Sequence, residues 1–291
     1  MSACPISYFN GSFLPDDEIH ISPHDRGFVF ADGTYEVFRS FRGKLFFAGE
    51  HIKRLSYSLS ELKIEFPELD NIIPTVNKLL ELNGLSNKEA TIYLQITRGV
   101  YKRMHPFPNE KVKPTLYINV KEFIPYTDYL SKGVKCISVK DIRWHRCDIK
   151  TIALLPNILA KQAAAEENAY EAIMIRDGFV TEGTHTNVFG VKDGIIYTHP
   201  KSNHILSGIS REIVIQLCKE NKIDLVEKAI PERLLTELDE LMLVGTSTEV
   251  MPVIMINDRK IKGGKPGPVC LNLQQLFKNF VKNYLEEQEN H

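Results

Sequence analysis

The sequence predicts a mixed α/β protein with two domains, on the strength of three observations. The chain has 291 residues, which is longer than one typical domain. Apolar residues make up 43% of it, enough for well-packed cores. Strand-like and helix-like segments alternate along its second half. We expect a small N-terminal α/β domain over residues 1–122, a linker over 123–130 and a larger mixed C-terminal domain over 131–291.

Turn signals and periodicity define the elements of the first domain. Asn10-Gly11 and Arg42-Gly43 are turn dipeptides between short strands, and each predicts a hairpin. Apolar residues from Ile52 to Leu62 recur at spacings of 3, 4 and 3, which predicts a helix. The expected elements are hairpins over 7–14 and 35–47, helices over 50–64 and 73–82, and strands over 90–97 and 115–120.

Pro125 and its polar neighbours mark the linker, and the alternating pattern follows it. The expected strands are 136–140, 172–175, 188–191, 195–198 and 241–244, and the expected helices are 155–168, 210–220, 231–238 and 271–285. The last helix is amphipathic.

Charge and cysteine usage exclude several classes of function. The net charge of −1 gives no electrostatic case for binding nucleic acid or an acidic membrane surface. No apolar run is long enough to cross a membrane, and the first residues do not resemble a signal peptide. The five cysteines are odd in number and widely spaced, which fits a reducing compartment, and no metal-ligand spacing is present. We expect a soluble cytoplasmic protein without a metal site.

Lys150 and Glu182 are the residues that point to a chemistry. Lys150 precedes the apolar residues 152–155, and Arg143 and Arg146 add positive charge nearby, conditions that favour a nucleophilic amine. Glu182 lies in Thr-Glu-Gly, which we expect to be a turn between two strands. Pyridoxal phosphate chemistry needs both groups, an amine for a Schiff base and an acid that keeps the pyridine nitrogen protonated. Taken singly, each residue is more often an ordinary surface lysine or turn acid.

Two further segments fit anions. Gly208 and Ser210 open a predicted helix, where free N–H groups and the helix dipole favour a phosphate, although a plain serine cap explains the pattern equally well. Thr246 and Arg54 are candidates to add a hydroxyl and a charge. Residues 97–106 form a basic loop in which Arg103 and His105 are suited to a substrate carboxylate, or simply face solvent.

Together these segments resemble the class IV aminotransferases, the fold-type IV pyridoxal phosphate enzymes, and within them most closely the bacterial D-amino-acid aminotransferases. The resemblance covers essentially the whole chain. The motifs that carry it are Asp25-Arg26-Gly27, Asp32-Gly33-Thr34-Tyr35-Glu36, Arg103-Met104-His105, Arg146-Cys147-Asp148-Ile149-Lys150, Thr181-Glu182-Gly183 and Gly208-Ile209-Ser210-Arg211.

The resemblance implies a role for each candidate residue. It makes Lys150 the catalytic lysine that holds the cofactor and moves the substrate proton, and Glu182 the partner of the pyridine nitrogen. The remaining cofactor contacts that it implies are Arg54, Ile209, Ser210 and Thr246 at the phosphate and Leu206 against the ring. Tyr35, Arg103 and His105 match a trap for the substrate carboxylate, the last two supplied by the neighbouring subunit. A homodimer with active sites at its interface is therefore implied.

Three positions depart from the family pattern. Thr151-Ile152-Ala153 stands where relatives often carry Ser-Leu-Asn, Gly245 where a hydroxyl residue is frequent, and His145 where an apolar residue is common. None of these changes removes a catalytic group.

The resemblance implies a ping-pong transaminase that moves an amino group between a D-amino acid, of the D-alanine or D-glutamate type, and a 2-oxo acid. Three alternatives stay open. An aminodeoxychorismate lyase is disfavoured by Arg103 and His105, and a branched-chain L-amino-acid aminotransferase usually has different substrate-side loops. A non-enzymatic cofactor-binding protein of this fold is disfavoured because every catalytic position is occupied.

Overall fold

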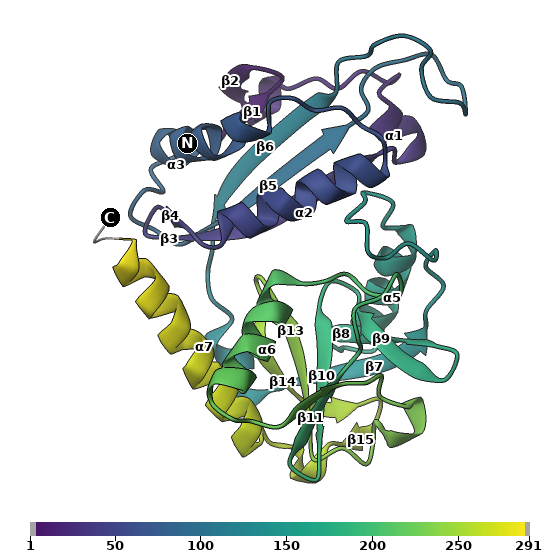
Figure 1. Cartoon of the computed structure of the whole chain (residues 1–291), viewed down its shortest axis with the longest axis vertical. Helices are drawn as coiled ribbons and strands as arrows, with labels where there is room; N and C mark the ends of the chain where they lie inside the picture. The colour runs from purple at the N-terminus through teal and green to yellow at the C-terminus, as the bar shows by residue number, and fades with distance from the viewer. Residues whose placement is uncertain (1–3, 289–291) are drawn as a thin grey trace. The chain divides into compact units, whose positions relative to one another are not determined.

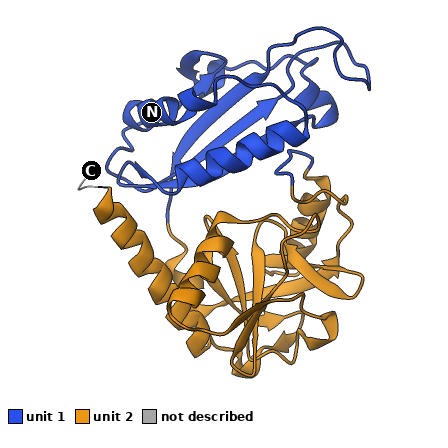
Figure 2. Cartoon of the chain, in the orientation of Figure 1, with its two compact units in different colours: residues 1–124, 149–153 blue, residues 125–148, 154–291 orange. Residues whose placement is uncertain are grey.

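The computed structural model describes residues 4–288, which divide into two compact units (Figures 1 and 2). Within that range unit 1 holds the residues up to 124 together with 149–153, and unit 2 holds 125–148 and the residues from 154 onward. The mixed α/β class expected from the sequence is confirmed. The units differ from the expected domains in two respects. Residues 149–153, from the expected C-terminal domain, pack with unit 1, and the expected linker 123–130 is divided between the units after residue 124.

Unit 1 is built on a six-stranded sheet with the strand order β2-β1-β6-β5-β3-β4. The strands are β1 (Ile6–Phe9), β2 (Ser12–Pro15), β3 (Gly33–Phe41), β4 (Lys44–Leu45), β5 (Ala90–Thr97) and β6 (Thr115–Glu122). All of these neighbours are antiparallel, and both expected hairpins, β1–β2 and β3–β4, are present.

Three helices accompany this sheet: α1 (Arg26–Phe30), α2 (Ala48–Glu61) and α3 (Ile72–Leu82). Helix α2 runs across the sheet (Figure 1), where Leu55 and Leu59 are buried in one core with Phe38 of β3. The apolar spacing therefore predicted both α2 and its buried side. Helix α1 was not expected, because five residues are too few to show a helical period.

Unit 2 is built on a nine-stranded sheet with the order β12-β11-β10-β13-β14-β7-β8-β9, and β15 pairs with β14. The strands are β7 (Val134–Lys140), β8 (Glu171–Arg176), β9 (Phe179–Gly183), β10 (Asn187–Lys192), β11 (Ile195–Thr198), β12 (Leu225–Glu227), β13 (Glu240–Gly245), β14 (Glu249–Ile256) and β15 (Arg259–Lys260). Strands β7 and β8 are parallel, so the chain between them makes a crossover. That crossover contains Lys150.

The helices of unit 2 are α4 (Thr127–Lys132), α5 (Leu155–Glu166), α6 (Ile209–Glu220) and α7 (Pro268–Glu287). The expected helices over 155–168, 210–220 and 271–285 are present. Helix α4 overlaps the segment that we expected to be a linker. Among the described helices, none is long and apolar enough to cross a lipid bilayer.

The helix expected over 231–238 is wrong. Only a short 3-10 turn is found there, at Glu232–Leu234. The start of the segment is fixed in extended form, because Ile230 accepts a hydrogen bond of 2.8 Å from Val180 and Pro231 bridges to Phe179 of β9. Its leucines still enter the core of unit 2, where Leu235 and Leu238 are buried.

Candidate functional site

Lys150 lies beside the start of β3 in unit 1. Its carbonyl oxygen accepts hydrogen bonds from the Tyr35 N–H at 3.1 Å and from the Thr34 hydroxyl at 2.7 Å. Its own N–H donates to the Ser58 hydroxyl on α2 at 3.2 Å. The side-chain amine lies 4.2 Å from the centroid of the Tyr35 ring, within the range of a cation–π contact. The structure thus brings two of the predicted site residues, Lys150 and Tyr35, into direct contact.

The residues after the lysine continue this pairing with β3. Ile152 donates its N–H to the Gly33 carbonyl at 3.1 Å, and the Thr151 hydroxyl donates to the same carbonyl at 3.0 Å. A bridge between Thr34 and Thr151 lies alongside. These bonds explain why residues 149–153 belong to unit 1. Thr151, one of the departures from the family pattern, uses its hydroxyl to fix the backbone after Lys150.

Arg54 projects from α2 and is held by a buried carboxylate. Its Nε and Nη2 donate to Glu36 at 2.7 and 2.8 Å, and Nδ1 of His51 lies 2.8 Å from the same carboxylate. Burial raises the pKa of Glu36, but Arg54 and His51 outweigh it and hold that pKa far below its usual range. Burial lowers the pKa of His51, so its imidazole is neutral at pH 7.

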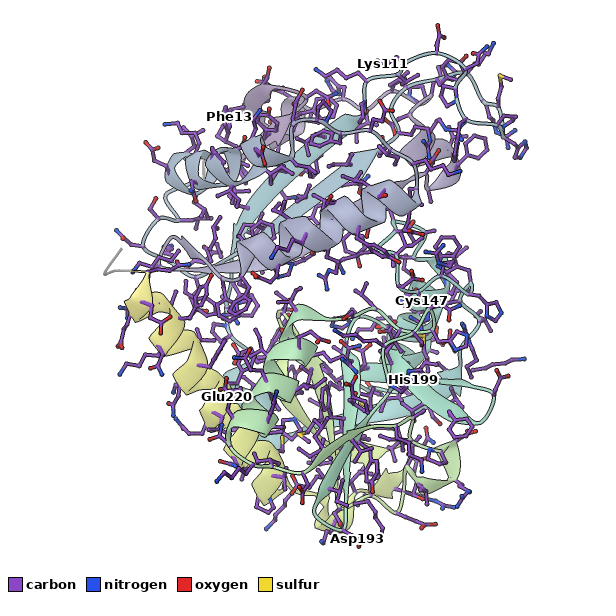
Figure 3. All side chains as sticks on the ribbon, viewed as in Figure 1. Phe13, Lys111, Cys147, Asp193, His199 and Glu220 are labelled. Atoms are coloured by element: carbon purple, nitrogen blue, oxygen red, sulfur yellow. The ribbon has the colours of Figure 1, made fainter. Side chains whose placement is uncertain are left out.

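Arg103 and His105 lie in the exposed connection from β5 to β6, the loop in which Figure 3 labels Lys111. The Arg103 guanidinium carbon lies 5.2 Å from the centroid of the Phe30 ring, and the His105 ring lies 5.5 Å from the same centroid. Both predicted carboxylate-binding side chains therefore lie close to the ring of Phe30, at the end of α1. The described contacts of this loop do not include Lys150.

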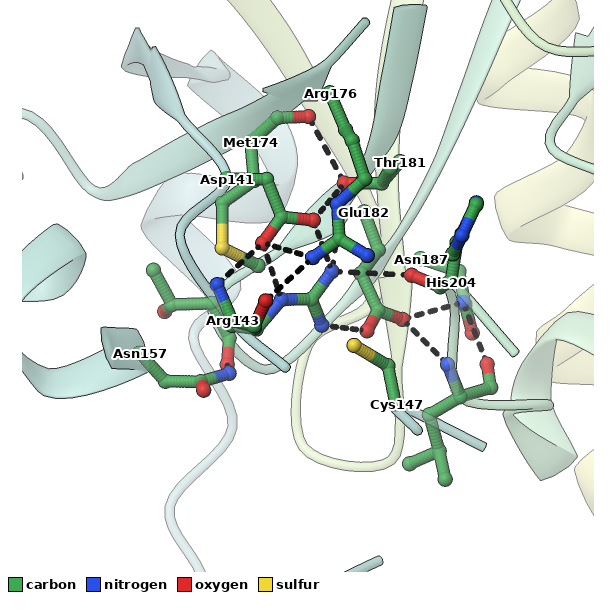
Figure 4. A network of polar contacts seen from close by, with 12 residues as sticks. Asp141, Arg143, Cys147, Asn157, Met174, Arg176, Thr181, Glu182, Asn187 and His204 are labelled. Atoms are coloured by element: carbon green, nitrogen blue, oxygen red, sulfur yellow. Dashed lines mark hydrogen bonds and ion pairs between the residues drawn. The ribbon is translucent and has the colours of Figure 1, made fainter. Parts of the chain in front are cut away.

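Glu182 belongs to β9 in unit 2, so the expectation that it lies in a turn is wrong. It is buried, 6% exposed, and the strand continues to Gly183. One carboxylate oxygen accepts from Nη1 of Arg143, and the other from the Leu206 N–H at 3.0 Å and the Asn187 amide at 3.2 Å (Figure 4). Burial raises the pKa of Glu182, and Arg143 opposes this rise. Because all three partners donate, they stabilise the ionised form.

Arg143 serves a second buried acid as well. Its Nε and Nη2 bind Asp141 at 2.9 and 2.7 Å, and Arg176 lies 3.0 Å from the same carboxylate (Figure 4). We expected Arg143 and Arg146 to add positive charge near Lys150; in the structure each arginine is paired with acids. Arg143 is paired with acids within unit 2, and Arg146 forms an ion pair of 2.9 Å with Asp148.

Helix α6 begins without a side-chain cap from the described residues. Gly208 is the N-cap, and no side chain of the described residues caps the first turn. Its first N–H groups therefore remain for another acceptor, and the alternative of a serine cap is not supported. A Cβ atom at Gly208 would lie 2.2 Å from the Asn187 side-chain oxygen. Glycine at this position therefore allows the close approach of the Asn187 side chain.

Leu206 and Thr246 are two further candidate cofactor contacts in unit 2. Leu206 is half-buried, and its carbonyl accepts from the Asn187 amide at 2.9 Å. Thr246 is half-buried in the turn between β13 and β14, directly after Gly245. A Cβ atom added at Gly245 would meet its nearest neighbour, Thr186, at 3.4 Å, which is ordinary van der Waals contact.

Considered unit by unit, the residues fit pyridoxal phosphate. Within unit 1, Lys150 offers an amine on a hydrogen-bonded backbone and Arg54 an oriented guanidinium. Within the described part of unit 2, Glu182 is a buried carboxylate and α6 begins without a side-chain cap. Sequence reasoning missed Glu36, His51, Arg143 and Asn187 as partners of the candidate residues. His51 and Arg54 are one helical turn apart on α2, which is a signal that they share a side of the helix.

Comparison with known proteins agrees with this chemistry. The family model described as amino-transferase class IV matches residues 33–256. The D-alanine aminotransferase of Staphylococcus haemolyticus is 40% identical over 95% of this chain and 98% of its own length. The D-alanine aminotransferase of Bacillus licheniformis is 39% identical over 94% of this chain and 96% of its own.

Solved structures show the same fold. The T.th. branched-chain amino acid aminotransferase complexed with N-(5'-phosphopyridoxyl)-L-glutamate has a TM-score of 0.87 and 26% identity, over 96% of this chain and 95% of its own. The branched-chain aminotransferase of Thermoproteus uzoniensis has a TM-score of 0.85 and 24% identity, over 95% and 94% of the two chains. The chain belongs to the class IV aminotransferases, enzymes that transfer amino groups with pyridoxal phosphate.

Proposed function

We propose that the protein is a D-amino-acid aminotransferase that uses substrates of the D-alanine or D-glutamate type with a 2-oxo acid acceptor, in a ping-pong cycle. The observation that supports this choice of substrate is the identity of 38 to 40% with relatives named D-alanine aminotransferase, over 94% or more of the chain. The chemistry is supported by the fixed Lys150 and by the buried Glu182 with its three donors.

The proposal assigns cofactor contacts to seven residues. They are Lys150, Arg54, Glu182, Leu206, Ile209, Ser210 and Thr246. Arg54, the N–H groups of Ile209 and Ser210, and the Thr246 hydroxyl bind the phosphate, and Leu206 packs against the ring. When bound, pyridoxal phosphate supplies an electron-withdrawing ring that stabilises negative charge at the substrate Cα.

The protein groups then have distinct tasks. Nζ of Lys150 takes the proton from Cα of the amino acid and later donates a proton to the cofactor. Glu182 favours a protonated pyridine nitrogen, because an ionised carboxylate in a buried place stabilises a cation close to it. Tyr35, Arg103 and His105 bind the substrate carboxylate, where the guanidinium offers paired donors.

The proposal includes a homodimer in which Arg103 and His105 act on the neighbouring subunit's substrate. Its support is that both side chains are exposed and that the described contacts of their loop do not include Lys150. We also propose a cytoplasmic location, which is supported by five cysteines that are all free thiols.

A branched-chain L-amino-acid aminotransferase is the second candidate, because the solved structures that resemble this chain include enzymes named as branched-chain aminotransferases. The identity of 26% to the T.th. enzyme is well below the 40% to the D-alanine relative. We therefore rank it second.

A panel of D- and L-amino acids with 2-oxoglutarate and pyruvate tests the proposal. We expect a yellow protein that turns over D-alanine and D-glutamate and has little activity on L-leucine or L-valine. Lys150→Ala abolishes turnover, whereas Lys132→Ala, which removes an exposed lysine paired with Asp128, leaves it unchanged. A colourless protein that takes up no added pyridoxal phosphate contradicts the proposal, and a preference for L-substrates favours the second candidate.

A further inference from the structure

Glu36, His51 and Arg54 form a buried polar group in unit 1, called here the Glu36 cluster. Glu36 is fully buried on β3, opposite Leu94 of β5 and two residues from the core side chain Phe38. An ionised carboxylate in such surroundings is costly unless it is fully paired.

The pairing of Glu36 is extensive and directional. Arg54 approaches it with two donors at 2.7 and 2.8 Å, in the fork geometry that arginine forms with carboxylates. Nδ1 of His51 lies 2.8 Å away, and since an ionised carboxylate only accepts, this nitrogen is the donor. The His51 ring in turn packs on Phe38, with 5.3 Å between centroids, so the third donor is also fixed.

Stability alone does not explain this arrangement. A buried ion pair is often no better for stability than well-packed apolar residues of the same volume. What it does provide is direction, because Arg has several rotatable bonds and the fork selects one orientation of its guanidinium. Binding an anion to an arginine that is already oriented loses less side-chain entropy.

We propose that Glu36 is a positioning residue that holds the Arg54 guanidinium in the orientation in which it binds the cofactor phosphate, with His51 fixing the carboxylate. The inference rests on the proposed role of Arg54 as a phosphate ligand. It adds to that role the reason why a carboxylate is buried beside a group that must bind an anion.

The charge of Glu36 by itself has the opposite effect. A carboxylate next to Arg54 reduces the attraction between Arg54 and a phosphate. If Glu36 only balanced charge, Glu36→Gln would tighten phosphate binding and Glu36→Asp would leave it unchanged. If Glu36 positions Arg54, both substitutions weaken phosphate binding, because Gln replaces two charge-assisted bonds and Asp is one methylene shorter. The sign of the change separates the two roles.

The experiment measures Kd for pyridoxal 5'-phosphate and for pyridoxal, which lacks the phosphate, on the full chain freed of cofactor. The ratio of the two constants isolates the contribution of the phosphate. If part of a variant is unfolded, both apparent constants rise by the same factor, so the ratio does not change. We expect Glu36→Gln to weaken pyridoxal phosphate binding by about 10-fold or more and Glu36→Asp by about 3- to 10-fold, with pyridoxal affinity within about 2-fold of the original. If one variant fails to fold, the other decides.

Two further variants make the result specific. Asp32→Asn is the matched control, because Asp32 also receives an arginine fork in unit 1, in a partly buried place, from Arg98 at 2.7 and 2.9 Å. It leaves the ratio unchanged. Arg54→Ala lowers the phosphate contribution by more than either Glu36 variant, and the effects of Arg54→Ala and Glu36→Gln are not additive.

The outcomes that overturn the inference are distinct from failure of the proposed function. An unchanged or tighter ratio in the Glu36 variants, with a large loss in Arg54→Ala, overturns the positioning role and leaves the phosphate role of Arg54 intact. An unchanged ratio in Arg54→Ala overturns both the positioning role of Glu36 and the phosphate role of Arg54. The aminotransferase proposal itself fails only if the original protein does not bind cofactor or transfer an amino group.

Discussion

Arg143 is shared by two buried acids of unit 2. Its guanidinium contacts both Asp141 and Glu182, and all three side chains are buried. Arg143→Gln removes the shared cation and leaves Glu182 with two neutral donors. We expect a loss of about 3–5 kcal/mol in the free energy of unfolding, the usual cost of stranding a buried charge. Urea unfolding measures it.

The matched control is Arg146→Gln. Arg146 also pairs with a nearby acid, Asp148, but its side chain is 41% exposed. Exposed pairs contribute at most about 1 kcal/mol, so this variant should be almost as stable as the original protein. Equal losses in the two variants would show that burial of the Arg143 pair has no special weight.

Asp141 makes stability depend on pH in the acid range. Hydrogen bonds and charge from Arg143 outweigh burial and lower the pKa of Asp141 from 3.8 to about 2. A carboxyl with a lowered folded pKa stabilises the protein above its unfolded pKa, and this contribution disappears as the pH falls through the folded value. It is therefore present at pH 5 and lost between about pH 4 and pH 2, and amounts to roughly 2 kcal/mol.

Asp141→Asn tests this contribution through the slope of the unfolding free energy against pH. The variant should have a flatter curve between pH 4 and pH 2, because the titrating group is gone. Parallel curves for the two proteins would mean that other carboxyls carry the acid dependence.

At Gly245 the structure has room for a larger side chain that could strengthen cofactor binding. A Cβ atom there meets only ordinary contacts, and the next residue, Thr246, is a proposed phosphate ligand. We expect Gly245→Ser to tighten binding of pyridoxal phosphate by about 3- to 10-fold, the value of one added hydrogen bond. Gly245→Ala adds the same Cβ without the hydroxyl and should leave Kd unchanged. A similar gain in both variants would assign the effect to the backbone instead.

At the scale of elements, the loop from β5 to β6 depends on its first residues. Gly99 has φ +97°, and a Cβ atom there would lie 2.1 Å from the Lys113 carbonyl on the returning side of the loop. Gly99→Ala therefore displaces the segment that carries Arg103 and His105. We expect a stability loss of about 1–3 kcal/mol and a raised KM for the amino acid, measured by steady-state kinetics.

Gly49→Ala in α2 is the control for this substitution. A Cβ atom at Gly49 has no neighbour within 4 Å, so alanine is accommodated. The variant should keep its KM and gain up to about 1 kcal/mol of stability. A KM increase in Gly99→Ala without a loss of stability would place the effect on the loop alone.

Elements with a strong local signal were predictable. Helix α2 shows an apolar stripe, and Asn10-Gly11 specifies the β1–β2 hairpin. Strand β9 gave no such signal, because the small polar residues of Thr181–Gly183 are typical of turns, yet they are buried in the sheet. The segment after Pro231 has a helical apolar pattern, but pairing with β9 fixes its start. Tertiary contacts decided both cases.

For the whole molecule, sequence reasoning found groups with reactive chemistry but not the partners that orient them. Lys150, Glu182 and Arg54 became candidates only when they were considered together with the other motifs of the chain. Glu36 and Arg143 were not recognised as their partners. Glu36 is 18 residues from Arg54, and Arg143 is 39 residues from Glu182. The return of residues 149–153 to unit 1 was equally hidden, since only long-range backbone pairing with β3 produces it.

Subunit mixing tests the proposed dimer directly. Lys150→Ala and Arg103→Ala each remove or severely reduce activity as pure proteins. If Arg103 acts on the neighbouring subunit's substrate, a mixed dimer contains one site with Lys150 from one chain and Arg103 from the other. Random exchange makes half of the dimers mixed, with one complete site of two, so activity should recover to about a quarter of the original.

If Arg103 instead acts within its own chain, no mixed dimer contains a complete site and activity stays at the level of the parents. The exchange is performed by partial unfolding and refolding of both proteins together, and pure parents treated in the same way provide the baseline. Replacing Arg103→Ala by His105→Ala in the mixture repeats the test for the second side chain. We expect activity to recover in both mixtures, the one with Arg103→Ala and the one with His105→Ala. Both side chains lie close to the Phe30 ring, so they should reach the neighbouring subunit together.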